Sequence, residues 1–185
     1  MPDAMLDLET LSTRPNAVIL SLGAVKFNPY TDDIDLDGGL HLRVDVDEQT
    51  ALGRDVQEET VKWWEKQPRE VQEAAFSADG RADVESLVKA LNKFLVGVDQ
   101  IWAQGPVFDI VILENLYRQL GIPTPWQFWQ IRDSRTLFGV FGDPREQGRK
   151  NAHNALMDCV YQAQGVQKIY SAQKLQPRFA IKFGT

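Results

Sequence analysis

Met5-Leu6-Asp7-Leu8-Glu9-Thr10-Leu11 is the stretch from which the fold of this 185-residue sequence can be inferred. It has four apolar residues and neither glycine nor proline, so we expect a strand. Side chains alternate between the two faces of a strand, and Asp7 and Glu9 therefore point the same way. Two carboxylates held close in a partly apolar site repel each other and need protons, cations or a metal to balance them. For this segment alone, an edge strand with two solvated acids is the alternative.

The composition is that of an ordinary globular protein. Hydrophobic residues make up 43% of the chain and charged residues 25%. We expect one domain over residues 1–185, with a core at about residues 4–171 and a basic tail at residues 172–185. The single cysteine, Cys159, cannot form an intramolecular disulfide, which favours a reducing compartment. Because the sequence has no apolar run of membrane-spanning length and no signal-peptide pattern, we expect a cytoplasmic protein without membrane contact.

The net charge of −6 is unevenly distributed. Residues 1–131 contain 11 Lys and Arg against 22 Asp and Glu, whereas residues 165–185 contain four basic residues and no acid. The bulk charge argues against a protein that coats nucleic acid through a basic surface, and an anionic substrate would need local basic residues and bound cations. A solvated, frayed terminus is the simpler interpretation of the basic tail.

Hydrophobic periodicity predicts a mixed sheet flanked by helices. The predicted strands cover residues 5–11, 17–27, 40–44, 101–103 and 128–131. The predicted helices cover residues 55–67, 69–76, 83–95, 109–120 and 154–170, and another turn-helix unit begins at 133–137. Residues 33–38 resemble the beginning of a calcium-binding loop, but Val44 occupies the twelfth position, so we predict a hairpin tip. The polar segment 142–151, which contains Arg145, Arg149 and Lys150, is predicted to be an exposed loop.

Three further residues are candidates to join the two acids of the first strand. Asp109 follows a strand and begins a predicted helix, the place where open α/β folds present ligands. Asp158 lies one turn into the last predicted helix, on a stripe with Asn154 and Gln162, and His153 comes just before that helix. Each residue also has an ordinary interpretation: Asp109 as a helix cap, Asp158 as a solvated acid and His153 as a loop residue.

These residues occur in the order and spacing of a known family. Asp7-Leu8-Glu9, Phe108-Asp109 and His153-Asn-Ala155-Leu-Met-Asp158 resemble the three exonuclease motifs of the DEDDh (DnaQ-like) family, and the resemblance extends over about residues 5–170. A lone Asp-x-Glu is a weak signal, but three motifs in order with the His-x-Ala-x-x-Asp spacing are specific.

Other segments are most similar to one subgroup, which contains phage T4 exonuclease A and a mycobacterial exoribonuclease-like family. They are residues 5–12, the Trp63-Trp64 pair and Arg132-Asp133-Ser134-Arg135-Thr136. From the residues alone, we expect the two tryptophans to be packing residues and not a stacking platform for bases. Gln104 stands where relatives often carry Asn, which we expect to affect substrate contacts more than metal binding.

The resemblance implies an α/β fold of the RNase H-like type. Its mixed five-stranded sheet has three antiparallel strands followed by two parallel ones, flanked by helices, in a single exonuclease domain. The implied activity is metal-dependent 3′→5′ hydrolysis of phosphodiester bonds at the 3′ ends of single-stranded DNA or RNA, with release of nucleoside 5′-monophosphates. The alternative is a non-catalytic module on the same fold that binds nucleic acid or metal, although such a relative should have lost at least one motif residue. A homodimer is one oligomeric state to consider, and a phage-encoded protein would act in the host cytoplasm.

The resemblance also implies roles for individual residues. The implied cofactors are two divalent cations, Mg²⁺ or Mn²⁺, held by the carboxylate oxygens of Asp7, Glu9, Asp109 and Asp158. Asp7 would contact both ions. His153 is the expected general base for the attacking water, since its unperturbed pKa lies near neutrality. The terminal nucleotide would bind beside the first motif, against Leu8, Thr10, Leu11 and Phe108.

Overall fold

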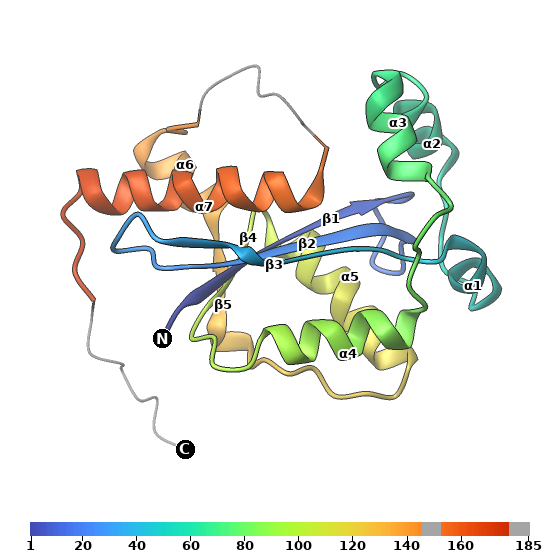
Figure 1. The fold of residues 1–185 in the computed structure, drawn as a ribbon, viewed down its shortest axis with the longest axis horizontal. Coiled ribbons are helices and arrows are strands. Elements are labelled where there is room, and N and C mark those ends of the chain that lie inside the picture. The colour runs from blue at the N-terminus through green and yellow to red at the C-terminus, as the bar shows by residue number, and fades with distance from the viewer. Residues whose placement is uncertain (146–152, 178–185) are drawn as a thin grey trace.

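The computed structural model describes residues 1–145 and 153–177 (Figure 1). Its strands form one mixed sheet in the order β3-β2-β1-β4-β5. Central strand β1 (Asp3–Thr10) pairs antiparallel with β2 (Ile19–Phe27), which pairs antiparallel with β3 (Ile34–Arg43). On its other side β1 is parallel to β4 (Ile101–Ala103), and β4 is parallel to β5 (Ile131–Asp133). The predicted sheet, three antiparallel strands followed by two parallel ones, is confirmed.

Helices cover both faces of this sheet (Figure 1). Helices α6 (Ser134–Phe141) and α7 (Ala155–Ala172) lie on one face, and α4 (Val84–Phe94) and α5 (Pro106–Gln119) lie on the other. The shorter helices at the end of the sheet are α1 (Val46–Ala51), α2 (Glu58–Trp64) and α3 (Arg69–Phe76). None of the helices in the described part of the chain is long and apolar enough to span a bilayer.

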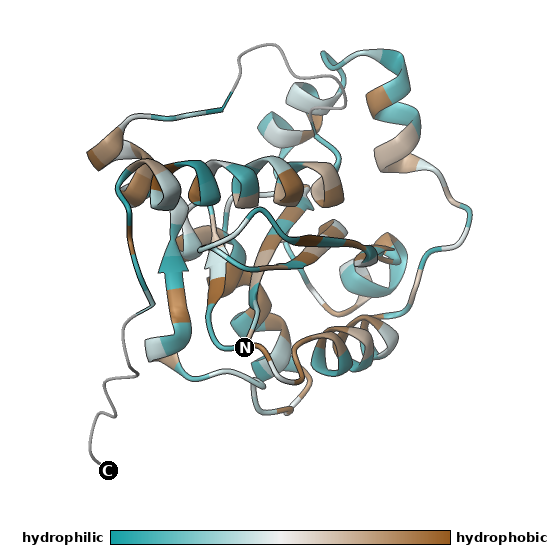
Figure 2. Cartoon of the chain, turned by 60° about the vertical axis from the view of Figure 1, so that its left-hand side comes forward, coloured by the Kyte–Doolittle hydropathy of each residue, from teal (hydrophilic) through white to brown (hydrophobic). Residues whose placement is uncertain are grey.

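Strand β1 divides its side chains between two apolar clusters, one on each face. Ala4, Leu6 and Leu8 pack in the cluster that contains residues of α4 and α5. Met5 belongs to the cluster with residues of α6 and α7, where Cys159 is buried without a disulfide. Figure 2 shows the apolar residues concentrated along the strands in the interior. Because alternate residues share a face, Asp7 and Glu9 point toward α7 with Met5.

A third apolar cluster attaches α2 and α3 to the sheet. Leu11, Val18 and Leu20 pack there against Trp64 and Ala75. The indole N–H of Trp64 also donates a hydrogen bond of 2.9 Å to the carbonyl oxygen of Thr10. Trp64 is therefore a packing residue, as predicted. Its neighbour Trp63 is 41% exposed.

Several boundaries differ from the sequence prediction around the β2–β3 hairpin. The predicted hairpin tip at residues 33–38 is wrong: the turn is formed by residues 28–33, closed by the N–H of Asn28 donating to the carbonyl of Asp33 at 3.0 Å. The acidic residues that follow belong to β3, where the Asp35 carboxylate accepts the N–H of Gly38 within a bulge. Helix α1 was not predicted, and its buried Gln49 hydrogen-bonds both the N–H and the carbonyl of Ile19.

Two further elements begin elsewhere than predicted. The helix expected from Asp109 begins at Pro106, because a proline lacks the N–H that the first helical turn leaves unpaired anyway. The strand expected at residues 128–131 is a 3₁₀ turn, η1 (Phe128–Gln130), followed by β5. Aromatic residues suggested a buried strand there, yet Phe128 is 81% exposed.

The predicted exposed loop at residues 142–151 is partly described. Arg145 is not exposed: its side chain is 11% accessible, pairs with Asp143 at 2.6 Å and lies over the ring of Phe138. Arg149 and Lys150 of this loop, and Arg178 and Lys182 of the basic tail, lie outside the described residues.

Gly23 allows the start of α7 to lie directly on the sheet. It is the partner of Asp7 in the β1–β2 ladder. A Cβ atom at Gly23 would lie 2.2 Å from the carbonyl carbon of Ala155, the fully buried first residue of α7. Backbone atoms cannot rotate away as a flexible side chain can, so any larger residue at position 23 must displace the helix.

We expect Gly23→Ala to lower the free energy of unfolding by about 3 kcal/mol, the upper part of the range for overpacked cores. Gly139→Ala in α6 is the matched control, because its Cβ would meet nothing within 4 Å. The free energy of unfolding of the control should rise by about 0.5–1 kcal/mol, because alanine has a higher helix propensity than glycine. Urea denaturation of both variants measures the difference, and a Gly23→Ala protein as stable as the wild type would contradict the close-approach argument.

Candidate active site

Three carboxylates converge at one end of β1. Asp7, Glu9 and Asp158 each offer an oxygen atom, and these three atoms all lie within 4.8 Å of one another. The first two come from β1, and Asp158 comes from the first turn of α7. A set made only of carboxylate oxygens suits a hard divalent cation better than it suits zinc.

The electrostatics of this cluster also fit a cation. Burial, followed by the charges of Asp158 and Asp109, raises the pKa of Glu9 to about 8. Burial and the same neighbouring acids, with Glu9 among them, raise the pKa of Asp7 well above its ordinary value. Asp7 and Glu9 are half-buried residues, and burial is the largest cause of the raised pKa of each carboxyl. A bound cation would relieve the repulsion among these acids.

Asp109 lies near these three carboxylates but is not part of the closest set. It lies in the first turn of α5 and is 4% exposed. One of its carboxylate oxygens accepts the backbone N–H of Leu8 at 3.0 Å, so it is hydrogen-bonded to β1 itself. Burial raises the pKa of Asp109 to about 7, although the Leu8 N–H and the charge of Arg135 act in the opposite direction. The structure thus places the four predicted ligands together, with Asp109 outside the closest set.

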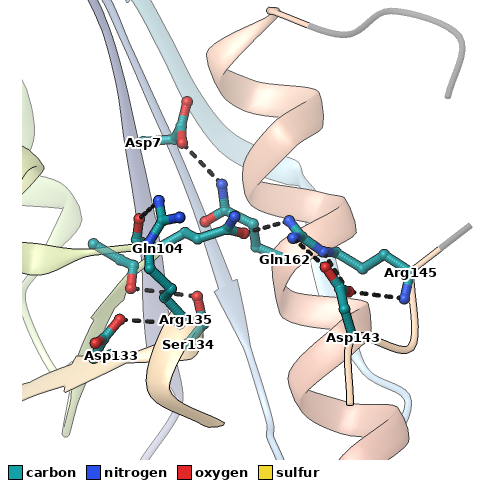
Figure 3. Close-up of polar contacts among 9 residues, drawn as sticks. Asp7, Gln104, Asp133, Ser134, Arg135, Asp143, Arg145 and Gln162 are labelled. Carbon is teal, nitrogen blue, oxygen red and sulfur yellow. Dashed lines mark hydrogen bonds and ion pairs between the residues drawn. The ribbon is translucent and has the colours of Figure 1, made fainter. Parts of the chain in front are cut away.

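Gln162 orients the Asp7 carboxylate. It lies one turn beyond Asp158 on α7, and its side-chain nitrogen donates to one Asp7 oxygen at 2.8 Å (Figure 3). The side-chain oxygen Oε1 of Gln162 is buried and has no hydrogen-bond partner in the described part of the chain. The predicted stripe through Asp158 and Gln162 faces the cluster, but the contact between Gln162 and Asp7 was not predicted.

His153 lies immediately before α7 in a strained conformation. Its φ of 65° is in the left-handed region, which residues with a Cβ seldom adopt. Its backbone N–H donates to Asp158 at 3.0 Å. Its imidazole ring meets the Trp63 ring edge to face, with centroids 4.8 Å apart. Backbone and side chain together place His153 between the acid cluster and α2.

A pocket of about 480 Å³ opens beside the acids. Its walls come from β1, the loop before α2, α2 and α5: Leu8, Glu9, Thr10, Thr13, Gln57, Glu59, Thr60, Trp63, Trp64 and Phe108. Three residues predicted to contact the terminal nucleotide are among them, but Leu11 is not, because it is buried in the cluster around Trp64. Sequence reasoning missed Gln57 and Thr60, and the tryptophan pair was the only available signal that α2 borders this pocket.

The sequence pattern of the Rv2179c-like 3′-5′ exoribonuclease domain matches residues 2–170. The chain belongs to this family. It is therefore a member of a family of 3′-5′ exonuclease domains, as its three motifs predicted. The exodeoxyribonuclease of Enterobacteria phage T4 is 26% identical to it over 165 residues, covering 74% of this chain and 70% of the phage protein.

Two solved nucleases share the fold. The crystal structure of cell-death related nuclease 4 superposes with a TM-score of 0.64 at 18% identity, covering 92% of this chain. The chain spans 64% of the length of that nuclease. The nuclease domain of 3′hExo, a DEDDh family member crystallised with rAMP, gives a TM-score of 0.59 at 12% identity, covering 94% of this chain and 92% of its own. The predicted RNase H-like DEDDh fold is thus confirmed.

The raised pKa of Glu9 makes the stability of the metal-free protein depend on pH. Since the folded-state pKa of about 8 exceeds the ordinary 4.5, folding favours the protonated form, and stability falls as pH rises from about 4.5 to about 8.

Asp7→Asn removes one repelling charge. In EDTA at pH 8 we expect this variant to be more stable than the wild type by about 1–3 kcal/mol, with the advantage shrinking toward pH 4.

Mn²⁺ should reverse this order, because only the wild type keeps all the charges that bind the ion. Urea denaturation at both pH values, with EDTA or Mn²⁺, tests this expectation. Asp37→Asn on β3 serves as the control for loss of a charge. Equal stability of wild type and Asp7→Asn in EDTA at pH 8 would show that the cluster is not under repulsion.

Proposed function

We propose that this protein is a metal-dependent 3′→5′ exonuclease that releases nucleoside 5′-monophosphates from single-stranded nucleic acid. The observation that carries the proposal is the convergence of Asp7, Glu9 and Asp158 beside a pocket whose volume suits one nucleotide. Family membership supports the same activity. A non-catalytic module on this fold would not need all four acids together with His153.

The four acids are the proposed ligands. Asp7, Glu9 and Asp158 would hold one divalent cation, Mg²⁺ or Mn²⁺, and Asp7 with Asp109 would hold a second. When bound, such a pair lowers the pKa of the attacking water and stabilises charge on the phosphoryl and leaving oxygens. The hydrogen bond from Leu8 to one Asp109 oxygen would keep this carboxylate fixed beside Asp7.

His153 is the proposed general base. It would take the proton from the water whose oxygen forms the new bond to phosphorus, while the bond from phosphorus to the 3′ oxygen of the departing strand breaks. A neutral imidazole accepts a proton near neutral pH, which suits this role. The hydrogen bond between the His153 backbone and Asp158 keeps the base next to the proposed metal ligands.

The pocket would receive the terminal nucleotide. Trp63 and Phe108 offer aromatic surface for a base, and Leu8 and Thr10 border the same space. A pocket of one-nucleotide volume at the acids favours attack at a chain end over internal cleavage. Because the family description names an exoribonuclease and the phage relative is an exodeoxyribonuclease, both DNA and RNA belong in the test.

The decisive experiment uses 3′-labelled and 5′-labelled single-stranded DNA and RNA of equal sequence. We expect shortening from the 3′ end with nucleoside 5′-monophosphates as product. EDTA should abolish hydrolysis, and Mg²⁺ or Mn²⁺ should restore it. A 3′-phosphorylated strand should be cut poorly, because the pocket would have to receive the added phosphate together with the terminal nucleotide. Degradation of circular strands at the same rate as linear ones, or activity that persists in EDTA, would refute the proposal.

A second experiment separates the roles of His153 and Asp7. His153→Ala should leave Mn²⁺ binding nearly intact and lower the rate roughly 10²–10⁴-fold, the usual contribution of general acid–base catalysis. Asp7→Asn should weaken Mn²⁺ binding and also lower the rate. The only other histidine, His41 on β3, provides the matched control His41→Ala. Calorimetric Mn²⁺ titration alongside turnover distinguishes these outcomes, and loss of metal by His153→Ala as severe as by Asp7→Asn would make the histidine a ligand.

A further inference from the structure

Arg135 lies across the turn that carries Asp109. It is the second residue of α6, and its guanidinium donates a hydrogen bond of 2.9 Å to the backbone carbonyl of Gln104 (Figure 3). A Cβ atom at Gly105 would lie 3.3 Å from its Nε atom, so the side chain crosses the connection from β4 to α5. The charge of Arg135 is near enough to Asp109 to lower the pKa of that carboxyl.

Asp133 fixes the backbone beneath this arginine. One of its carboxylate oxygens accepts the N–H of Gly105 at 3.1 Å and that of Arg135 at 3.0 Å. The other oxygen accepts the hydroxyl of Thr136 at 2.6 Å. The start of α6 is thereby linked to the start of α5, and the position of Arg135 relative to Asp109 does not depend on a mobile side chain alone.

Arg135 is an exposed residue of α6. None of the ion pairs in the described ranges, 1–145 and 153–177, includes it. Nearby Arg145 is different, because Asp143 neutralises it and it also donates to the Gln104 side chain (Figure 3). A guanidinium has five N–H donors in a planar fork that matches two phosphate oxygens. Arg135 therefore retains donors and charge for an anion.

The position of Arg135 indicates which phosphate it would meet. The pocket lies on the α2 side of the acids, whereas Arg135 lies beyond β4, on the β5 and α6 side. Figure 1 shows α2 and α6 on opposite sides of the molecule. If the terminal nucleotide fills the pocket and the scissile phosphate meets the acids, the rest of the strand leaves over β4. We propose that Arg135 binds the first phosphate 5′ of the scissile bond; this inference rests on the proposed function.

The test pairs a protein variant with a matching change in the substrate. One oligonucleotide carries an ordinary phosphate at the linkage 5′ of the scissile bond, and the other carries an uncharged methylphosphonate there. Arg135→Gln should lose about 10–100-fold in kcat/KM on the ordinary strand, mainly through KM, as expected for a charged hydrogen bond. The wild type should lose a similar factor on the methylphosphonate strand. Arg135→Gln should lose little more on that strand, because the same contact is already absent.

Three further measurements sharpen the result. The slope of log kcat/KM against log salt should become shallower by about 0.7 in Arg135→Gln, the value for one phosphate contact on a single strand. Arg135→Lys should fall between the wild type and Arg135→Gln, since it keeps the charge but not the fork. Arg69→Gln on α3, where Arg69 pairs with Glu73 on the surface, is the control and should change nothing.

Two results would overturn the inference: an Arg135→Gln variant with wild-type kinetics, or one whose loss is equally large on both strands. The second result would mean that Arg135 acts on the acid cluster or on the scissile phosphate. The same cycle measured as binding, by fluorescence anisotropy of the two labelled strands, gives an answer independent of turnover. A wild type that binds with this pattern but never cleaves would refute the proposed function and leave the Arg135 contact supported.

Discussion

The contact between the first turn of α7 and β2 at Gly23 is the constraint on which the candidate site depends. Two acids belong to β1, near the start of the chain, and the third belongs to α7, some 150 residues later in sequence. They meet because α7 lies against backbone with no intervening side chain, at the ladder position opposite Asp7. The apolar cluster under α6 and α7 then holds the helix in place. A displacement of α7 would therefore move Asp158 away from Asp7 and Glu9.

The same geometry concentrates negative charge that the protein only partly compensates. Gln162 donates to Asp7, Leu8 donates to Asp109, and Arg135 acts on Asp109 from a distance. None of these contacts neutralises Glu9, whose pKa is raised to about 8. The apolar clusters on the two faces of the sheet therefore offset the repulsion among the acids at the end of β1, which is unfavourable without a cation. Local instability of this kind is common where a site must bind a charged ligand.

Much of the fold and of the candidate site could be predicted from sequence, because the patterns that indicate them lie within short segments. Alternation placed Asp7 and Glu9 on one face, and the helices predicted from residues 83 and 154 are α4 and α7, for which Asp83 and Asn154 are the N-caps. Prediction failed where tertiary contacts decide the outcome. Exposed aromatic residues at η1 resembled a buried strand, and an acidic stretch of β3 resembled a turn. The pocket wall on α2 and the contact of Gln162 with Asp7 join segments that are distant in sequence, and no spacing rule connects them.

The bulge in β3 limits how copies of this protein can associate. Within the described residues, β3 and β5 each pair on one side only, so they are the two edges of the sheet. An open edge is a template for a strand of another molecule, and natural proteins protect such edges with bulges, inserted charges or short strands. Here β3 is interrupted near Gly38 and carries Asp35 and Asp37, while β5 has three residues. Neither edge offers a long, regular, apolar strand, which disfavours aggregation by edge-to-edge pairing and fibrous growth through a continuous sheet.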